Sequence, residues 1–141
     1  MKTLKTIALG LALLTTVFTA NAADKPIERL TKHYAINTYI DAMSRGRLQG
    51  FNEVLDPTAT FSMLRGTQVC SYNKKDMLKF MKDNQNVEQA CTVSTSEVES
   101  NDNITVVKVD MKFNGFIRSN YVTVANTGDG WKITNVHSVF K

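Results

Sequence analysis

The stretch that decides the fold is residues 39–61, which read YIDAMSRGRLQGFNEVLDPTATF. Its first residues complete an apolar helical pattern, and Gly46 can end that helix by taking the left-handed conformation. The apolar residues that follow predict a short second helix over residues 48–55. The Asp-Pro pair at 56–57 should end this helix, because the residue before a proline is pushed out of the α region. A strand is then expected from Ala59.

The first helix should begin near Pro26, a residue tolerated in a first turn, and run to about Ser44. One of its faces is apolar at helical spacing, through Ile36, Tyr39, Ile40 and Met43. A hairpin over residues 59–64 and 67–72 should follow the second helix. Asn73 then resembles an N-cap for a third helix that runs from residue 74 to about 84.

The third helix is expected to bury a methionine-rich face made of Met77, Leu78, Phe80 and Met81. Methionine fills irregular space adaptably, so this face could fill the core or line a tolerant pocket.

The rest of the chain predicts four long strands, over residues 91–99, 104–113, 116–125 and 131–140. Asn114-Gly115 is the strongest hairpin signal between them, because both positions tolerate positive φ. Residues 107–113 alternate between apolar and charged, so one face of the sheet should be buried and the other wet. We therefore expect an α+β fold, in which a curved antiparallel sheet packs against three helices from the N-terminal half.

The first 22 residues are expected to be a signal peptide. Lys2 and Lys5 precede an apolar run over residues 7–18, which is too short for a bilayer, where about 20 residues are needed. Small residues around Ala22 suit a signal peptidase, so we expect cleavage after Ala22 and a periplasmic or secreted domain over residues 23–141. Retention of the segment as a membrane anchor is the alternative.

The charge balance gives no support to binding of nucleic acid or an anionic membrane. The chain has 17 basic and 13 acidic side chains, a net charge of +4. Without Lys2 and Lys5, the expected exported domain has 15 basic and 13 acidic side chains and therefore a net charge of +2. This charge is small and evenly scattered. The densest lysine cluster lies on the predicted third helix at a spacing typical of a solvated face.

Two cysteines, Cys70 and Cys91, remain in the expected exported domain. An oxidising compartment favours a disulfide, and closing a loop of about 20 residues could stabilise the fold by roughly 3 kcal/mol. Two separate thiols are the alternative. No metal site is expected, because these cysteines, His33 and His137 lie far apart without a ligand motif. No glycine-rich phosphate loop is present either, and we expect no cofactor.

The order helix, helix, hairpin, helix and four long strands resembles the nuclear transport factor 2-like superfamily. Its members are curved α+β cones with a pocket between sheet and helices. The resemblance covers nearly all of residues 23–141. It is carried by residues 39–42 with Gly46, by LDPTATF at 55–61 and by GWKI at 130–133. Exported bacterial members described as lumazine-binding or polyketide-cyclase-like look closest.

Ketosteroid isomerase is a member of this superfamily, so its catalytic roles can be compared position by position. Its oxyanion-stabilising tyrosine falls on Tyr39, which is retained. Its general base, an aspartate on the first strand, falls on Met63, which accepts no proton. Its second oxyanion donor, a protonated aspartate, falls near Val122 or Thr123, where no carboxyl exists. The resemblance therefore implies a cone with a pocket and leaves two of these three roles vacant.

The favoured function is a noncatalytic pocket that binds a small apolar or aromatic molecule. Its motivation is the methionine at position 63 together with the retained Tyr39. The expected lining residues are Tyr39, Met63, Met111, Phe113, Tyr121 and Trp131.

Two other functions stay open. An isomerase, dehydratase or cyclase could pair Tyr39 with His137 on the last strand, unless His137 lies at a sheet rim or a dimer surface. An interaction module could form a homodimer through the outer sheet face, where Val122 and Val124 are expected. Asp110 and Arg118, on strands joined by one hairpin, are expected to form an exposed structural ion pair.

Overall fold

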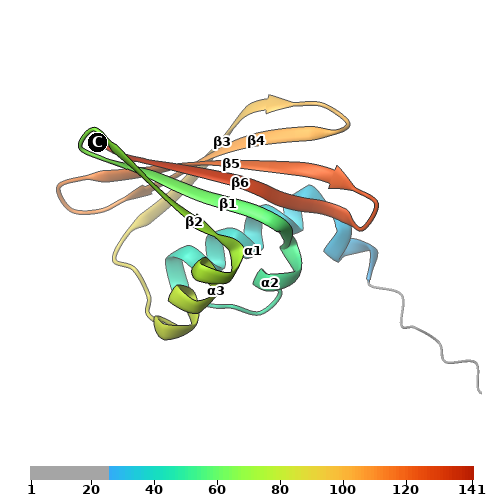
Figure 1. Ribbon diagram of the computed structural model, residues 1–141, viewed down its shortest axis with the longest axis horizontal. Coiled ribbons are helices and arrows are strands. Elements are labelled where there is room, and N and C mark those ends of the chain that lie inside the picture. The colour runs from blue at the N-terminus through green and yellow to red at the C-terminus, as the bar shows by residue number, and fades with distance from the viewer. Residues whose placement is uncertain (1–25) are drawn as a thin grey trace, which may run out of the picture.

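The structure is a computed structural model that describes residues 26–141; the expected signal segment lies outside them. A six-stranded sheet in the order β2-β1-β6-β5-β4-β3 curves over three α-helices on one of its faces (Figure 1). The predicted fold class is confirmed. The elements in chain order are the 3-10 helix η1 (Ile27–Leu30), α1 (Lys32–Arg45), α2 (Phe51–Val54), β1 (Leu55–Arg65), β2 (Gln68–Asn73), α3 (Lys74–Asp83), β3 (Thr92–Ser100), β4 (Ile104–Lys112), β5 (Ile117–Thr127) and β6 (Gly130–Phe140).

The first helix is divided at Thr31, where the sequence predicted one continuous helix from Pro26. The backbone of Thr31 is extended, and its hydroxyl accepts a hydrogen bond from the Tyr34 amide at 3.1 Å. This N-cap satisfies one of the free donors at the start of α1, which explains the break after η1. Gly46 ends α1 in the left-handed conformation, with φ of 64°, as predicted. Among residues 26–141, no helix is both long and apolar enough to cross a membrane.

The second helix is shorter than predicted, because α2 covers only Phe51–Val54 and β1 already begins at Leu55. The Asp-Pro pair therefore lies in the strand and does not follow a helix directly. Asp56 accepts hydrogen bonds from the amide and the hydroxyl of Thr58, at 2.8 and 2.6 Å. These bonds favour an extended turn at the start of β1, in line with the restriction that a proline places on the residue before it.

One pair of strands departs from the expected antiparallel pattern. The other four neighbouring pairs are antiparallel, but β1 runs parallel to β6 and joins Met63 to Ser138 in register. A parallel pair requires a crossover connection, and here β2, α3, β3, β4 and β5 all lie between the two strands in the chain. This pairing brings the β1–β2 hairpin against the C-terminal strand.

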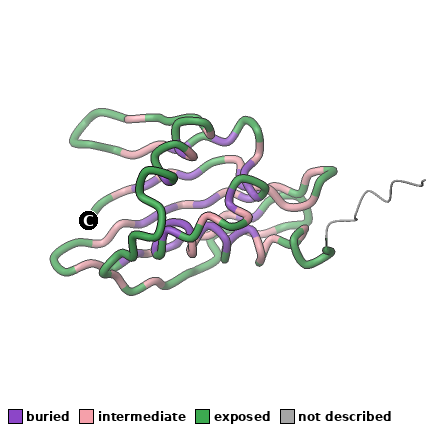
Figure 2. Tube along the Cα trace, turned by 90° about the horizontal axis from the view of Figure 1, so that it is seen from below, coloured by how far each residue is buried: buried purple, intermediate pink, exposed green. Residues whose placement is uncertain are grey.

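The inner face of the sheet and α1 form the core. Buried stretches run along the middle of the strands and the facing helix, whereas the hairpin ends are exposed (Figure 2). The predicted alternation along β4 is confirmed for Val109 and Met111, which are buried. Phe80 was expected to be buried on α3, but it is 59% exposed. The short α3 turns only Met77 and Met81 fully inward, and Phe80 lies at the edge of that face.

Val122 and Val124 face the core and not the outer surface. Both are 0% exposed, and Val122 lies in register between Val107 and Val136. Because side chains alternate along a strand, the outward residues of β5 are Tyr121 and Thr123. The reason given for dimerisation through these valines was therefore wrong.

Substitutions at Gly46 and Gly66 test how much the end of α1 depends on close packing. Both residues have positive φ, which costs a residue with a Cβ about 1–2 kcal/mol. A Cβ at Gly46 would lie 2.7 Å from the Asn86 nitrogen, whereas a Cβ at Gly66 meets nothing within 4 Å. Gly46→Ala should therefore lower the free energy of unfolding, measured in urea, clearly more than Gly66→Ala. Equal losses would show that the contact with Asn86 contributes nothing.

Candidate functional site

An apolar cavity of about 540 Å³ opens between α3, the β1–β2 hairpin and the ends of β5 and β6. Methionine and phenylalanine side chains make up much of its wall, with charged groups among them. The lining residues are Met43, Met63, Arg65, Tyr72, Asp76, Met77, Lys79, Phe80, Arg118 and Phe140. A second cavity of about 490 Å³, beside η1 and the outer side of α1, has a mainly polar and charged lining.

Local contacts hold α3 over the first cavity. The Asn73 side chain accepts a hydrogen bond from the Asp76 amide at 2.9 Å, so the predicted N-cap is confirmed. Lys74 donates to the backbone carbonyls of Asn52 and Leu55, each at 2.9 Å. These bonds join the start of α3 to α2 and β1, and so place Met77 opposite the sheet.

Arg118 projects from the inner face of β5 into the cavity wall, next to Met111 in the register of β4 and β5. Its Nη2 donates to Ser138 Oγ at 3.5 Å, and its Cζ lies 5.9 Å from the ring centre of Phe140. Its Nε is buried and has no hydrogen-bond partner in the part of the chain that the structure describes. Among residues 26–141, no carboxylate forms an ion pair with Arg118.

The expected ion pair between Asp110 and Arg118 is absent, because the two side chains lie on opposite faces. Asp110 is in register with Ser119, one residue further along β5. It accepts a hydrogen bond from the Ser119 hydroxyl at 2.6 Å and pairs with Lys108 at 3.1 Å on the outer face. Because side chains alternate along a strand, a shift of one residue moves a side chain to the opposite face of the sheet. Asp110 thus has outer partners, and Arg118 has no counter-ion within residues 26–141.

Tyr39 is completely buried, and its hydroxyl has no hydrogen-bond partner among the described residues. Burial raises the pKa of its phenol from 10.0 to about 12, while the positive charge of Arg118 opposes that shift. The hydroxyl therefore stays protonated at neutral pH and can only donate to an anion. Tyr39 lies behind the cavity wall and does not line it directly.

Sequence reasoning missed three inward polar residues of the last two strands: Arg118, Asn120 and Ser138. Asn120 accepts a hydrogen bond from Ser138 at 2.7 Å and donates to the Val109 carbonyl at 3.2 Å. Placing Val122 and Val124 on the inner face would have revealed them, because residues 118 and 120 share that face. At the positions matched to the second acid, Val122 is buried and Thr123 faces outward.

The expected lining residues do not gather in one place. Met63 lines the 540 Å³ cavity, and Tyr39 and Met111 are buried beside its wall. Phe113 stacks on Phe116 with ring centres 4.6 Å apart, at the strand ends near Phe140. Tyr121 lies on the outer face, in register with His137 and Lys108.

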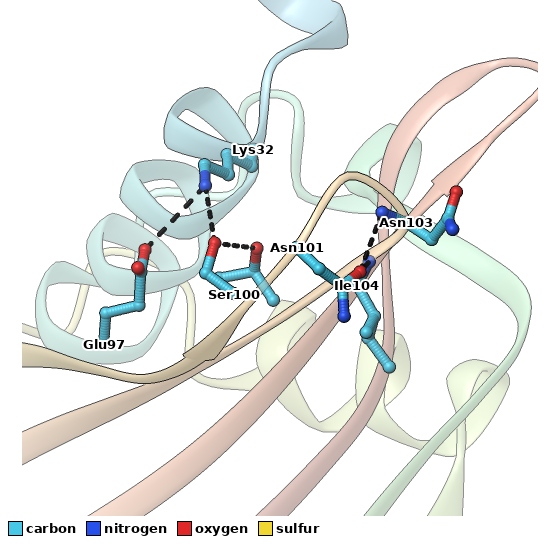
Figure 3. A network of polar contacts seen from close by, with 7 residues as sticks. Lys32, Glu97, Ser100, Asn101, Asn103 and Ile104 are labelled. Carbon is cyan, nitrogen blue, oxygen red and sulfur yellow. Dashed lines mark hydrogen bonds and ion pairs between the residues drawn. The ribbon is translucent and has the colours of Figure 1, made fainter.

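Trp131 lies at the other end of β6, where Lys32 is 5.8 Å from its ring centre. Lys32 reaches from the start of α1 to β3, where its ammonium donates to Ser100 at 3.0 Å and lies 3.8 Å from Glu97 (Figure 3). Thr105 extends this network to β4 through a bond of 3.1 Å to Ser100. Trp131 therefore belongs to a separate polar contact between α1 and the sheet edge.

His137 and Tyr39 do not converge. Nδ1 of His137 lies 2.7 Å from the Ser62 hydroxyl, and both residues project from the outer face of the sheet. Tyr39 belongs to the core on the inner face. The geometry therefore does not form the acid-base pair considered from the sequence.

Both cysteines are free thiols in this structure. Cys70 is on β2, and Cys91 immediately precedes β3, which is the strand at the opposite edge of the sheet. The Cys70–Cys91 bridge considered from the sequence is not formed. No group of three or more His, Cys, Asp or Glu residues within 26–141 is arranged to hold a metal ion.

Comparisons with known proteins agree with this architecture. The model of the family described as "Putative lumazine-binding" matches residues 28–140. No curated protein matches the sequence. An NTF-2 like protein of unknown function from Silicibacter pomeroyi is 17% identical, with a TM-score of 0.61 over 77% of this chain and 90% of that chain.

Two further solved structures are similar. A cystatin-like fold protein from Burkholderia xenovorans is 15% identical, with a TM-score of 0.61 over 82% of this chain and 93% of that one. A protein titled a putative ketosteroid isomerase, from Parabacteroides distasonis, is 14% identical, with a TM-score of 0.54 over 75% and 84% of the two chains. At these identities the likeness shows the fold alone.

Replacement of Tyr39 by phenylalanine should stabilise the protein. The variant loses a buried hydroxyl that has no partner, and an unsatisfied buried polar group costs about 1–3 kcal/mol. The difference should widen between pH 10 and pH 12. In that window the phenol of Tyr39 ionises in the unfolded wild-type protein but stays protonated in the folded protein. The free energy of unfolding of the wild type therefore falls by roughly 2–3 kcal/mol.

Urea unfolding of both proteins at several pH values measures this difference. Lysine ionisation is common to both proteins and cancels in the comparison. A difference that stays constant above pH 10 would contradict the buried phenol.

Proposed function

The chain belongs to the family described as "Putative lumazine-binding", and we propose that it is a noncatalytic binding protein for a small apolar or aromatic molecule. The observation that carries this proposal is the cavity of about 540 Å³ with its apolar wall. Ligand pockets usually have volumes of about 300–1,000 Å³ and are lined mainly by apolar and aromatic side chains with a few polar groups.

The chemistry of the wall suits a flat ring system. Met43, Met63 and Met77 supply polarisable thioethers, which adapt to rings of different shape. Phe80 and Phe140 add aromatic faces that are 59% and 49% exposed, so they are available for stacking. The family description names lumazine, a fused bicyclic heteroaromatic compound, and supports the same ligand class.

The noncatalytic assignment is supported by the absence of a placed base. The resemblance to ketosteroid isomerase matches Met63 to that enzyme's aspartate, and His137 projects from the outer face of the sheet, where it contacts Ser62. Among the described residues, the lining contains one carboxylate, that of Asp76, which is exposed on α3. A general base must lie within hydrogen-bond reach of the proton that it removes, deep in the pocket.

Phe80→Ala should weaken binding of lumazine or of a naphthalene derivative several-fold, because it removes an aromatic wall from the cavity. Its side chain is largely exposed, so the loss of stability should be small. Val98→Ala is the control, since Val98 is 55% exposed on β3 and does not line the cavity. Isothermal titration calorimetry gives the affinities, and chromatography of the recovered ligand shows whether it has been changed.

Native mass spectrometry of the protein purified from its source cells provides an independent test. A retained small molecule that is lost in Phe80→Ala supports the proposal. If no retained mass is found and neither lumazine nor the naphthalene compounds bind, the proposed function is wrong.

We further propose that the protein acts outside the cytoplasm after removal of residues 1–22. The support is the charged start and the short apolar run of this segment. Expression of the full chain in a bacterium with a periplasm should yield a periplasmic protein whose intact mass begins at Ala23. Leu13→Arg interrupts the apolar run and should leave the chain in the cytoplasm, uncleaved. An uncleaved, membrane-bound wild type would support the anchor alternative.

A further inference from the structure

Arg118 is the unusual residue of the cavity. Its guanidinium lines the cavity beside methionine and phenylalanine side chains, and among residues 26–141 its buried Nε has no partner and no carboxylate pairs with it. The hydrogen bond that it donates to Ser138 is long, at 3.5 Å. Arg118 is partly buried, and a partly buried charge without a counter-ion is less favourable than a paired one.

We propose that the ligand is an organic anion, a carboxylate on an apolar or aromatic body, and that Arg118 binds the carboxylate. This inference rests on the proposed function and adds the charge of the ligand and its orientation. The guanidinium is a planar fork of donors that matches a carboxylate, and hydrogen bonds between charged groups are roughly twice as strong as neutral ones. The apolar body then lies against the methionines and Phe80, toward the mouth.

The charges around the cavity favour an anion. The lining contains three basic side chains, Arg65, Lys79 and Arg118, and one acidic side chain, Asp76. Asp110, the carboxylate nearest to Arg118 in the strand register, is held on the outer face by Ser119 and Lys108. The hydrogen bond from Ser119, assisted by Lys108, holds the pKa of Asp110 below its usual value. The Asp110 carboxylate therefore stays charged and bound to these two residues on the outer face.

The contact with Phe140 gives Arg118 neither a hydrogen-bond acceptor nor a negative charge. The Cζ atom lies 5.9 Å from the ring centre, a distance at which a cation–π contact is weak to moderate. The ring supplies no acceptor to the buried Nε. A ligand carboxylate would supply both the missing acceptor and the missing charge.

A matched pair of probes tests the proposal: naphthalene-2-carboxylate and naphthalene-2-carboxamide, which share one aromatic body. At pH 7 the carboxylate should bind at least tenfold more tightly than the amide to the wild-type chain, measured by titration calorimetry. Arg118→Met should reduce this ratio to about one and retain amide binding, because the methionine keeps the wall apolar. Arg118→Lys keeps the charge, loses the fork and should give an intermediate ratio.

The control variant is Arg45→Met, which removes an exposed arginine paired with Asp41 on α1, away from the cavity. It should leave the ratio unchanged. Circular dichroism confirms that each variant is folded; if Arg118→Met does not fold, the ratio in Arg118→Lys decides. A wild-type ratio near one, or a ratio that Arg118 variants do not change, overturns the inference while the pocket stands. Failure of both probes to bind overturns the inference, and the proposed function falls with it if lumazine does not bind and no retained mass is found.

The dependence of binding on salt distinguishes the partly buried Arg118 from the exposed basic residues at the rim. Preference for the carboxylate should persist when salt is raised from about 0.05 M to about 0.5 M, because buried pairs are screened less than exposed ones. A preference that disappears in high salt would assign the selectivity to Arg65 and Lys79 at the rim and would overturn the role of Arg118.

Discussion

The parallel pairing of β1 with β6 is the constraint on which the cavity depends. It sets Met63 beside Ser138, and the antiparallel pairing of β6 with β5 then sets Ser138 beside Asn120 and Phe140 beside Arg118. Together these two pairings form the walls of the cavity, one from β1 and the other from β5 and β6. Helix α3, anchored through Lys74, closes the space between them. If β1 moved away from β6, no local interaction would hold these residues together.

The alternation of side chains along the strands decides which functional groups point into the cavity. Along β6, Ser138 turns inward to Asn120, while His137, its neighbour in the chain, turns outward to Ser62. Along β4 and β5, Asp110 and Ser119 pair on the outside, and Met111 and Arg118 meet on the inside. A histidine and a carboxylate that could act as bases are therefore removed from the pocket by a single residue step each.

The local signals in the sequence predicted much of the fold. The glycine after α1, the cap at Asn73 and the hairpin at 114–115 act through their own backbone conformations, so their effects can be read locally. The boundaries of α1 and α2 were less accurate, because Thr31 and Asp56 form side-chain bonds that compete with the helix. The parallel pair joins strands about 75 residues apart, and no local pattern reports such a pairing.

The candidate site was predictable only in part for the same reason. Met63, which was named from the resemblance to ketosteroid isomerase, lies in the wall of the cavity. Arg118 was assigned to a surface ion pair, because the exact register of β4 and β5 cannot be obtained from a hairpin signal alone. A shift of one residue in this register decides whether Arg118 pairs with Asp110 on the surface or lies in the cavity without that partner.

That difference in register also bears on the kind of chemistry the fold supports. Proton abstraction next to a carbonyl requires an acceptor near the substrate and a donor for the negative charge that develops. Of the two donors, the Arg118 guanidinium lines this cavity, whereas the Tyr39 phenol, held protonated by burial, lies behind its wall. Met63 provides no acceptor, and the inward polar pair of Asn120 and Ser138 satisfies itself. This arrangement agrees with the proposal that the cavity receives an anion that is already formed when it enters.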